Sequence, residues 1–232
     1  SVIGTKIREM WPVWNDASRK SALSNISSIL SQLSSSSSSS STAFSTSSSN
    51  PEMTRFCVTA ATGALLCAST PSMSHLAIDL IRSAGASVFL TELLRILPEE
   101  SKPIHSPSID SFLSSISPNV ISHCVSLISH HPPTTNTRFS ISSAICCLKS
   151  WAEFPGINIE SPESSGIFPS TISLISSPGC DIVLKILAFD MISEIVSGVS
   201  APSFSKRPSS LSAIFAAVIQ LFDSGSAFAL AL

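Results

Sequence analysis

The stretch FLTELLRILPEES, Phe89 to Ser101, carries the clearest fold signal in the chain. Leu90, Leu93, Leu94 and Leu97 recur at spacings of three and four residues, the period of one helix face. Proline has no N–H and clashes with the preceding turn, so Pro98 predicts that this helix, which begins near Val88, ends at Leu97. The residues from Glu99 to Pro103 are then expected to face water. The stretch therefore predicts a buried helix with an abrupt exit.

The same pattern of apolar helix, short break and next helix recurs on both sides of this stretch. Paired units begin near Ser72, Ser108 and Gly166, and no segment shows sustained strand alternation with hairpin turns. Ser117 to Asn119 is expected to kink or split the long helix that contains it, and Leu76, Leu80 and Ile81 are expected to be buried. The predicted helices cover residues 5–11, a segment capped by Asn15 or Asp16, 51–69, 73–83, 88–97, 108–129, 137–154, 169–176, 180–199 and 211–222.

Helical units of roughly 35 to 60 residues are typical of HEAT and armadillo arrays, in which each helix pair packs on its neighbours. The predicted fold class is therefore all-α, a HEAT/armadillo-type α-solenoid of stacked antiparallel helix pairs. Because the chain begins at Ser1 and has no stop signal at its end, residues 1–232 are interpreted as a fragment of one helical-repeat solenoid. A compact all-α bundle is the alternative.

Residues 34–50 are almost all serine and threonine. Serine competes with helix hydrogen bonds and buries little apolar surface, so this tract is predicted to be a disordered insertion. It is interpreted as inert, with phosphorylation as the alternative.

Composition limits the classes of partner. Charged residues make up 12% of the chain, against about 25% in ordinary domains, and the net charge of −2 includes no basic block. This argues against direct binding to nucleic acid, which requires a clustered cationic face. The apolar run from Leu211 to Phe222 is shorter than the ~20 residues that span a bilayer, and no signal peptide is visible, so no membrane association is expected.

Neither a catalytic nor a metal site is indicated by the sequence. No G-x-S-x-G motif and no glycine-rich phosphate loop occurs, and only His130 and His131 lie together among the histidines. The 6 cysteines contain no C-x-x-C pair and sit among apolar residues, which favours reduced thiols packed in the core. The chain is therefore expected to be a binding protein without enzymatic activity, cofactor or metal.

Three segments resemble one protein family. They are PEMTRFCVTAATGALLCAST (Pro51 to Thr70), FLTELLRILPEES with its Leu97-Pro98-Glu99-Glu100 sequence, and AICCLKSWAEFPGI (Ala144 to Ile157). In this order and spacing they are similar to consecutive helices of the importin-β superfamily of nuclear transport receptors, in the transportin-SR and importin-thirteen branch, near the exportin-one-like domain. TKIREMWPVWNDASRKSALSNIS resembles an earlier family segment more loosely. The chain departs from the family between Ile104 and Ser111, where the usual arginine-rich stretch is missing.

The resemblance implies a curved solenoid that carries protein cargo through nuclear pores. It implies three partners, which are the cargo, the GTPase Ran and the phenylalanine-glycine repeats of the pore, and a location in both nucleus and cytoplasm. It also implies that the chain lies in the N-terminal half of such a receptor, after the first Ran-contacting helices. The alternative is a HEAT-repeat scaffold for a vesicle coat, a kinase or a chromatin complex.

Sparse charged residues on the expected inner helices are the candidate partner contacts. They occur as neighbours, Glu52 with Arg55, Glu92 with Arg95, Lys149 with Glu153 and Asp190 with Glu194, and we term the predicted contact set the charged ladder: Arg55, Glu92, Arg95, Lys149, Glu153, Asp190 and Glu194. The alternative is that they are solvated neighbours on their own helices.

Three further residues, Leu97, Pro98 and Trp151, are assigned structural roles. Trp151 continues the apolar stripe of Ala144 and Leu148, so core packing is favoured over a role in recognition.

Overall fold

The computed structural model describes residues 2–39, 51–85, 88–104, 106–130, 137–152, 166–177, 179–198 and 212. Regular structure in these ranges is helical, without a strand, so the prediction of an all-α chain is confirmed. The chain divides into two compact units, Ser1–Leu113 and Ser114–Leu232, and each is described by itself.

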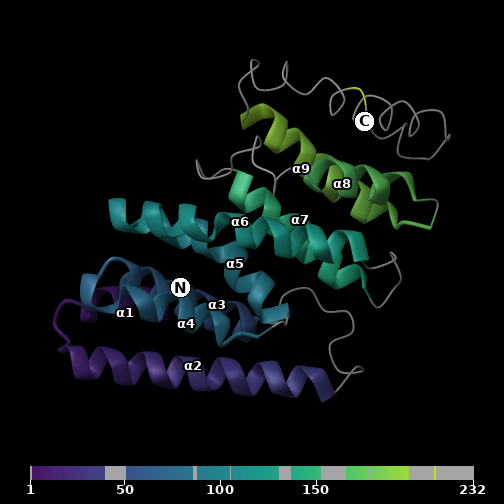
Figure 1. The fold of residues 1–232 in the computed structure, drawn as a ribbon. Coiled ribbons are helices and arrows are strands. Elements are labelled where there is room, and N and C mark those ends of the chain that lie inside the picture. The colour runs from purple at the N-terminus through teal and green to yellow at the C-terminus, as the bar shows by residue number, and fades with distance from the viewer. Residues whose placement is uncertain are drawn as a thin grey trace. The chain divides into compact units, whose positions relative to one another are not determined.

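Figure 1 shows the helices in chain order. The first unit contains α1 (Val2–Met10), α2 (Asp16–Ser39), α3 (Pro51–Ala68), the short 3₁₀ helix η1 (Pro71–Met73), α4 (Ser74–Arg82) and α5 (Val88–Ser101). α6 (Pro107–His130) begins in the first unit and continues into the second, which also contains α7 (Arg138–Ala152), α8 (Ile167–Ser176) and α9 (Ile182–Gly198). The predicted helix at 211–222 lies outside the described residues, except for Ser212, which is helical.

α3 lies in the middle of the first unit and is contacted by α1, α2, α4 and α5. Its first neighbour, α1, runs in the same direction. At one end, a Cβ built on Gly4 would lie 3.1 Å from Thr62 Oγ1. Beyond the other end, Trp11 Nε1 donates a hydrogen bond to Thr70 Oγ1 at 3.2 Å. Residues later in the α1 segment contact residues later in the α3 segment, so the two helices are parallel.

α5 also runs parallel to α3. The Cys57 thiol lies 4.0 Å from the Phe89 carbonyl oxygen, and Thr62 Oγ1 donates to Glu100 Oε2 at 3.2 Å near the other end of the pair. α1, α3 and α5 are thus three parallel helices, and α3 contacts both of the others.

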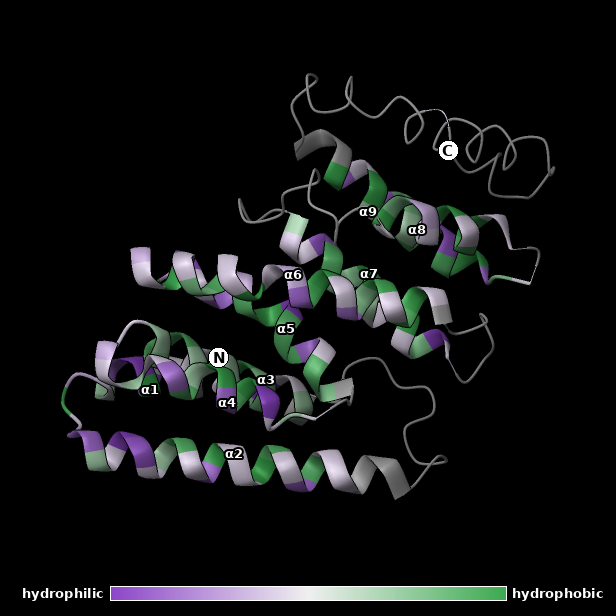
Figure 2. Ribbon diagram, viewed as in Figure 1, coloured by the Kyte–Doolittle hydropathy of each residue, from purple (hydrophilic) through white to green (hydrophobic). Residues whose placement is uncertain are grey.

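α2 and α4 are the remaining helices of the first unit, and they contact each other as well as α3. A Cβ at Gly63 of α3 would lie 3.5 Å from both Leu23 and Leu80, which is ordinary van der Waals contact, so both helices pack on α3 at this position. Farther along, Ser31 Oγ donates to the Ser83 carbonyl at 3.4 Å. Figure 2 shows green and purple residues alternating along α2, as expected for a helix with one face on the unit.

The second unit repeats this order. Arg138 at the start of α7 pairs with Asp181, and Lys149 near its end pairs with Asp190, so α7 and α9 run parallel. The other two helices are also parallel, because a Cβ at Gly166 would lie 2.9 Å from Val125 Cγ1 and the hydroxyls of Ser129 and Ser170 lie 2.7 Å apart. In both units, alternate helices therefore share a direction.

The residues assigned structural roles are buried. Leu97 and Trp151 are fully buried, and Pro98 is also in the interior. Of the three α4 residues expected in the core only Leu80 is buried, since Leu76 and Ile81 are half-buried. The buried stripe of this segment consists of Met73, Ala77, Leu80 and Ala84.

The predicted end of the Phe89–Ser101 helix is wrong, because α5 continues through Pro98 to Ser101. Pro98 cannot donate a hydrogen bond to the carbonyl four residues earlier, and its ring crowds that carbonyl, so the helix continues here at a local cost in free energy. Ser101 Oγ donates to the Pro98 carbonyl at 2.7 Å, and both residues are buried. Packing within the unit thus stabilises a turn that local propensity disfavours.

The predicted disordered insertion at 34–50 is also wrong in part. α2 extends to Ser39, and residues 40–50 lie outside the described residues. Extending an existing helix is much easier than starting one. Ser35 Oγ donates to the carbonyls of Ser31 and Gln32 at 3.0 Å, so the serine hydroxyl bonds within the helix instead of disrupting it.

The Pro118 region is continuous helix, because α6 runs over 24 residues through it and is not split. The buried residues on the two sides of Pro118 include Leu113, Ser117 and Val120. Packing at the helix period on both sides therefore maintains a single helix.

Candidate functional site

The ladder residues on α5 form an ion-pair cluster within their own helix. Arg95 Nε donates to Glu92 Oε2 at 2.9 Å, and Arg95 Nη2 donates to Glu92 Oε1 at 2.7 Å. Arg95 Nη1 also lies 3.6 Å from Glu99 Oε1. The predicted neighbour relation is confirmed, and two parallel hydrogen bonds make it a fork-shaped pair of defined geometry.

The Cys57 thiol lies beside this cluster and is buried. Burial, with a smaller effect from the negative charge of Glu92, raises its pKa to about 12. Burial likewise raises the pKa of Cys67 to about 12. A thiol with such a pKa is protonated at neutral pH and is a poor nucleophile. All six cysteines are free thiols, and all except Cys146 are buried, so the predicted packing in the core is confirmed for five of them.

The third ladder residue of the first unit, Arg55, is exposed on α3. Its carbonyl accepts a 2.9 Å hydrogen bond from Thr59 Oγ1. The side chain of its expected neighbour Glu52 lies outside the described residues. Arg55 is therefore accessible at the surface of its unit.

The ladder residues of the second unit are joined in an unexpected way. Lys149 Nζ on α7 donates to Asp190 Oδ2 on α9 at 2.5 Å. The expected neighbour of Lys149 is Glu153, which lies outside the described residues. Glu194 follows Asp190 by one helix turn and is half-buried. Sequence spacing within one helix could not reveal a pair formed between two helices.

A second pair between α7 and α9 was missed by the sequence analysis. Arg138 Nη1 lies 2.8 Å from Asp181 Oδ2, and Asp181 Oδ1 accepts a 2.7 Å hydrogen bond from the Val183 N–H. Asp181 therefore caps α9 and holds the start of α7 at the same time. An aspartate directly before an apolar helix was the available signal for the cap.

The end of α5 is tied to α1 and α3. Glu100 Oε2 accepts the hydrogen bond of Thr62 and lies 3.6 Å from Arg8 Nη1, which is buried. Glu100 is half-buried and Ser101 is buried, so the expectation that the whole exit faces water is wrong for these two residues. Glu99 and Lys102 are exposed, as expected.

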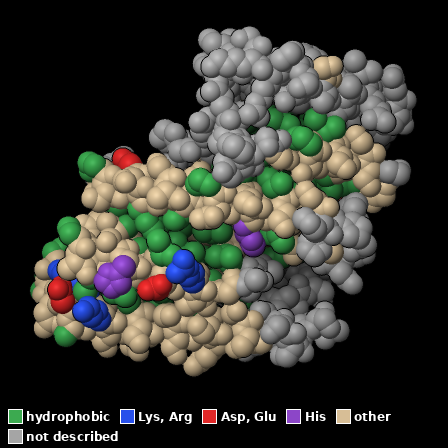
Figure 3. Space-filling model, viewed as in Figure 1, with side chains coloured by type: hydrophobic (Ala, Val, Ile, Leu, Met, Phe, Trp, Pro, Cys, Tyr) green, Lys and Arg blue, Asp and Glu red, His purple; other side chains and the backbone are tan. Residues whose placement is uncertain are grey.

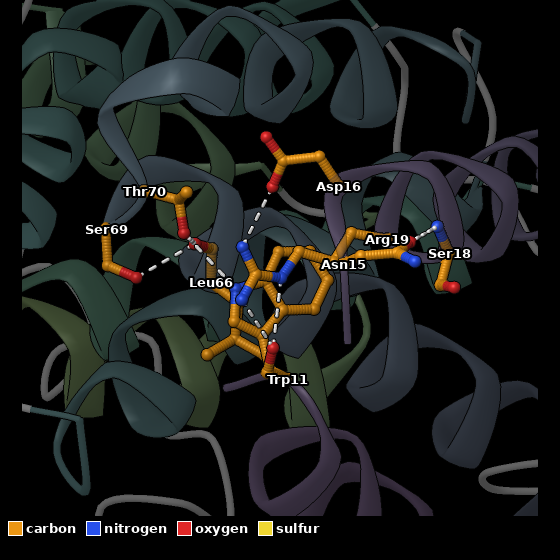
Figure 4. Close-up of polar contacts among 8 residues, drawn as sticks. All are labelled: Trp11, Asn15, Asp16, Ser18, Arg19, Leu66, Ser69 and Thr70. Atoms are coloured by element: carbon orange, nitrogen blue, oxygen red, sulfur yellow. Dashed lines mark hydrogen bonds and ion pairs between the residues drawn. The ribbon is translucent and has the colours of Figure 1, made fainter. Parts of the chain in front are cut away.

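The turn between α1 and α2 is held by a cluster around Trp11 (Figure 4). Arg19 donates to the Trp11 carbonyl from Nε at 3.0 Å and from Nη2 at 2.8 Å, and its Nη1 lies 3.0 Å from Asp16 Oδ1. Its guanidinium also lies 5.5 Å from the centroid of the Trp11 ring. The predicted cap at Asn15 is confirmed, because its Oδ1 accepts the Ser18 N–H at 2.8 Å. This cluster fixes the path of the chain between two helices.

These charges mostly serve contacts within the chain. On the face shown in Figure 3, the charged side chains gather over the first unit, and most of the other described surface is uncharged. Among the described residues, no three His, Cys, Asp or Glu side chains are grouped so as to hold a metal ion. The arrangement is suited to holding helices together.

α6 has the length and apolar composition of a helix that could span a membrane. By length and composition alone, its Pro107–Ser129 part could cross a bilayer, and α3 with the following segment to Arg82 passes the same test only as a pair bent by 116°. The prediction of no membrane association was based on shorter runs such as Leu211–Phe222, so the length argument behind it does not cover α6. Core helices of soluble proteins also pass this test.

Comparison of the chain with protein-family models, with curated proteins and with solved structures found no match.

Proposed function

We propose that the chain is part of an importin-β-type nuclear transport receptor, built as a HEAT/armadillo-type α-solenoid of stacked antiparallel helix pairs. The observation that carries this proposal is the shared direction of alternate helices, α1, α3 and α5 in one unit and α7 and α9 in the other. Successive helix hairpins stacked side by side produce this order. The resemblance of residues 51–70, 89–101 and 144–157 to the family supplies the functional part.

In this proposal the chain binds protein cargo and Ran, and phenylalanine-glycine repeats allow passage between cytoplasm and nucleus. GTP-bound Ran and cargo favour different curvatures of the array, so each changes the affinity for the other. No chemical step is required of the chain.

Fewer residues of the charged ladder are free of contacts within the chain than the sequence suggests. Glu92 and Arg95 bind each other, and Lys149 binds Asp190, so a partner would have to replace these pairs. Arg55 is exposed and carries the contact role most directly. Charge reversal at Arg55, Arg95 and Lys149 in the protein of natural length tests the contacts, and unchanged binding of Ran and cargo would exclude the ladder from both surfaces.

One observation favours a second candidate, a HEAT-repeat scaffold for another assembly. The pairs Arg138–Asp181 and Lys149–Asp190 both join α7 to α9. Here the charged side chains stabilise the packing of two helices, as a structural scaffold requires. A scaffold would need neither Ran nor pore repeats.

A pull-down separates the two candidates. The protein of natural length is passed over immobilised GTP-loaded Ran, GDP-loaded Ran and phenylalanine-glycine repeats. A transport receptor is retained by GTP-loaded Ran and by the repeats, and much less by GDP-loaded Ran. Retention on none of the three would exclude the receptor and leave the scaffold.

A further inference from the structure

The turn between α1 and α2 presents apolar side chains to solvent. Val13 is 77% exposed, the highest fraction of any large apolar residue that the structure describes. Met10, at the end of α1, is 45% exposed, and Pro12 is also exposed. Trp14 is half-buried, and its ring centroid lies 6.5 Å from that of Trp11. We term Met10, Pro12, Val13 and Trp14 the apolar tip.

The apolar tip is held in place by bonds to the rest of its unit (Figure 4). Trp11 is buried and donates its Nε1 bond to Thr70, and the two bonds from Arg19 to the Trp11 carbonyl fix the backbone beside the tip. The Trp14 N–H donates to the Met10 carbonyl at 3.1 Å, which closes the turn itself. A tip fixed in this way loses little conformational entropy when it binds.

The place and the size of the apolar tip favour a lipid surface over a protein as its partner. Neighbouring hairpins in a helical array pack along the sides of helices, so stacking does not cover a turn. The tip also provides much less than the roughly 800 Å² that each partner buries in a stable protein interface. In a bilayer, even a few apolar side chains contribute, because the binding free energy grows with the apolar area that leaves water.

Basic side chains flank the apolar tip on both helices. Lys6 lies on α1 and Lys20 on the second turn of α2, and both are exposed. Neither forms an ion pair within the described part of the chain, whereas Arg19 and Asp16 pair with each other. Glu9 is exposed as well and offsets one of the two lysines, which leaves the surroundings of the tip with a net positive charge. This charge is complementary to anionic lipid headgroups.

We propose that the apolar tip inserts into the surface of an anionic lipid bilayer. Val13 and Met10 enter the edge of the acyl-chain layer, Trp14 lies at the level of the headgroups, and Lys6 and Lys20 bind the headgroups. The expectation of no membrane association was based on spanning length and on the lack of a signal peptide, and neither applies to a turn that inserts from one side. The inference does not depend on the transport proposal, because it uses only this turn and its charges.

Vesicle binding by the full chain tests the insertion. Vesicles of phosphatidylcholine and phosphatidylserine in equal parts are added, and binding is measured by co-sedimentation and by tryptophan emission. The emission is expected to shift to shorter wavelength as Trp14 leaves water, since Trp11 and Trp151 are already buried.

Val13→Asp should weaken this binding by about tenfold or more, because a charge would have to enter the apolar layer. Ile29→Asp is the matched control, since Ile29 is 43% exposed on α2 away from the turn, and it should bind like the parent chain. Circular dichroism checks that both variants keep the helical fold.

The composition of the vesicles tests the role of the lysines. Lys20→Gln should weaken binding to the mixed vesicles by about fivefold and leave binding to pure phosphatidylcholine unchanged, because one lysine charge contributes only with anionic lipid. Soluble glycerophosphoserine should not compete, because it offers no apolar layer.

Three results would overturn the proposal: no vesicle binding, parent-like binding by Val13→Asp, or competition by the headgroup alone. Absence of vesicle binding would leave the apolar tip to a protein partner, and equal weakening of Lys20→Gln on both kinds of vesicle would contradict the role of the lysines. None of these measurements includes Ran or pore repeats, so failure here leaves the pull-down result unaffected.

Discussion

Lys149 on α7 and Asp190 on α9 are joined by a hydrogen bond of 2.5 Å between Nζ and Oδ2. Both residues were predicted to contact a partner, and they contact each other. The pair lies on the seam between two parallel helices, together with Arg138 and Asp181. The pair therefore stabilises the packing of α7 against α9.

Exchanging the two charges tests this relationship. Lys149→Asp or Asp190→Lys alone places like charges together and should lower the free energy of unfolding by up to about 1 kcal/mol, since the pair is partly exposed. The double exchange should recover most of this loss in urea denaturation. A double variant that loses the sum of the two single effects would show that the residues do not interact.

Trp151 is fully buried in the second unit, so truncation should leave a large cavity. Trp151→Ala is expected to lower the free energy of unfolding by roughly 3–5 kcal/mol. Trp14, which is half-buried, is the matched control and should cost clearly less when changed to alanine. Thermal unfolding of both variants measures the difference, and similar midpoints would contradict the packing of Trp151.

Gly85 lies in the turn after α4 with a φ of 61°, in the left-handed region. Gly85→Ala should be destabilising by about 1–2 kcal/mol, because an L-residue is strained there and its Cβ would lie 2.5 Å from Ser34 Oγ. Gly179→Ala is the control, since a Cβ at that position meets nothing within 4 Å. If chemical denaturation gave equal stabilities for the two variants, the turn would not have the conformation described.

The buried thiols predict how stability depends on alkaline pH. Cys57 and Cys67 have pKa values of about 12 in the folded chain, against a usual value of 9.0. Between pH 9 and 12 the unfolded chain therefore loses protons that the folded chain retains, and the free energy of unfolding falls as pH rises. The chain contains no tyrosine to add its own titration in this range.

The measurement is urea denaturation at pH 7 to 10.5, compared with the variant Cys57→Ala, Cys67→Ala. The parent chain should lose stability more steeply above pH 9 than this variant. Parallel curves would mean that the two thiols are not shielded from water.

The helices themselves were largely predictable from the sequence, and the reasons are local. The leucine spacing of α5, the Asn15 cap and the glycine at the turn near 85 are signals carried within a few residues. The predictions that failed depended on tertiary packing. Pro98 is accommodated because the last turn of α5 is buried, and Ser34–Ser39 prolong a helix that the preceding residues begin.

The candidate site was less predictable, because its pairs join distant parts of the chain. Lys149 pairs with Asp190, and Arg8 lies near Glu100, across separations that no period or motif encodes. Glu92 and Arg95, by contrast, are three residues apart on one helix and could be paired from spacing alone.

The most direct test of the account is a titration of the natural-length protein with Ran by calorimetry, once loaded with GTP and once with GDP. If the paired helices belong to a nuclear transport receptor, GTP-loaded Ran binds at least about tenfold more tightly, a difference of roughly 1.4 kcal/mol. Equal affinities for the two forms, or no binding to either, would contradict the account.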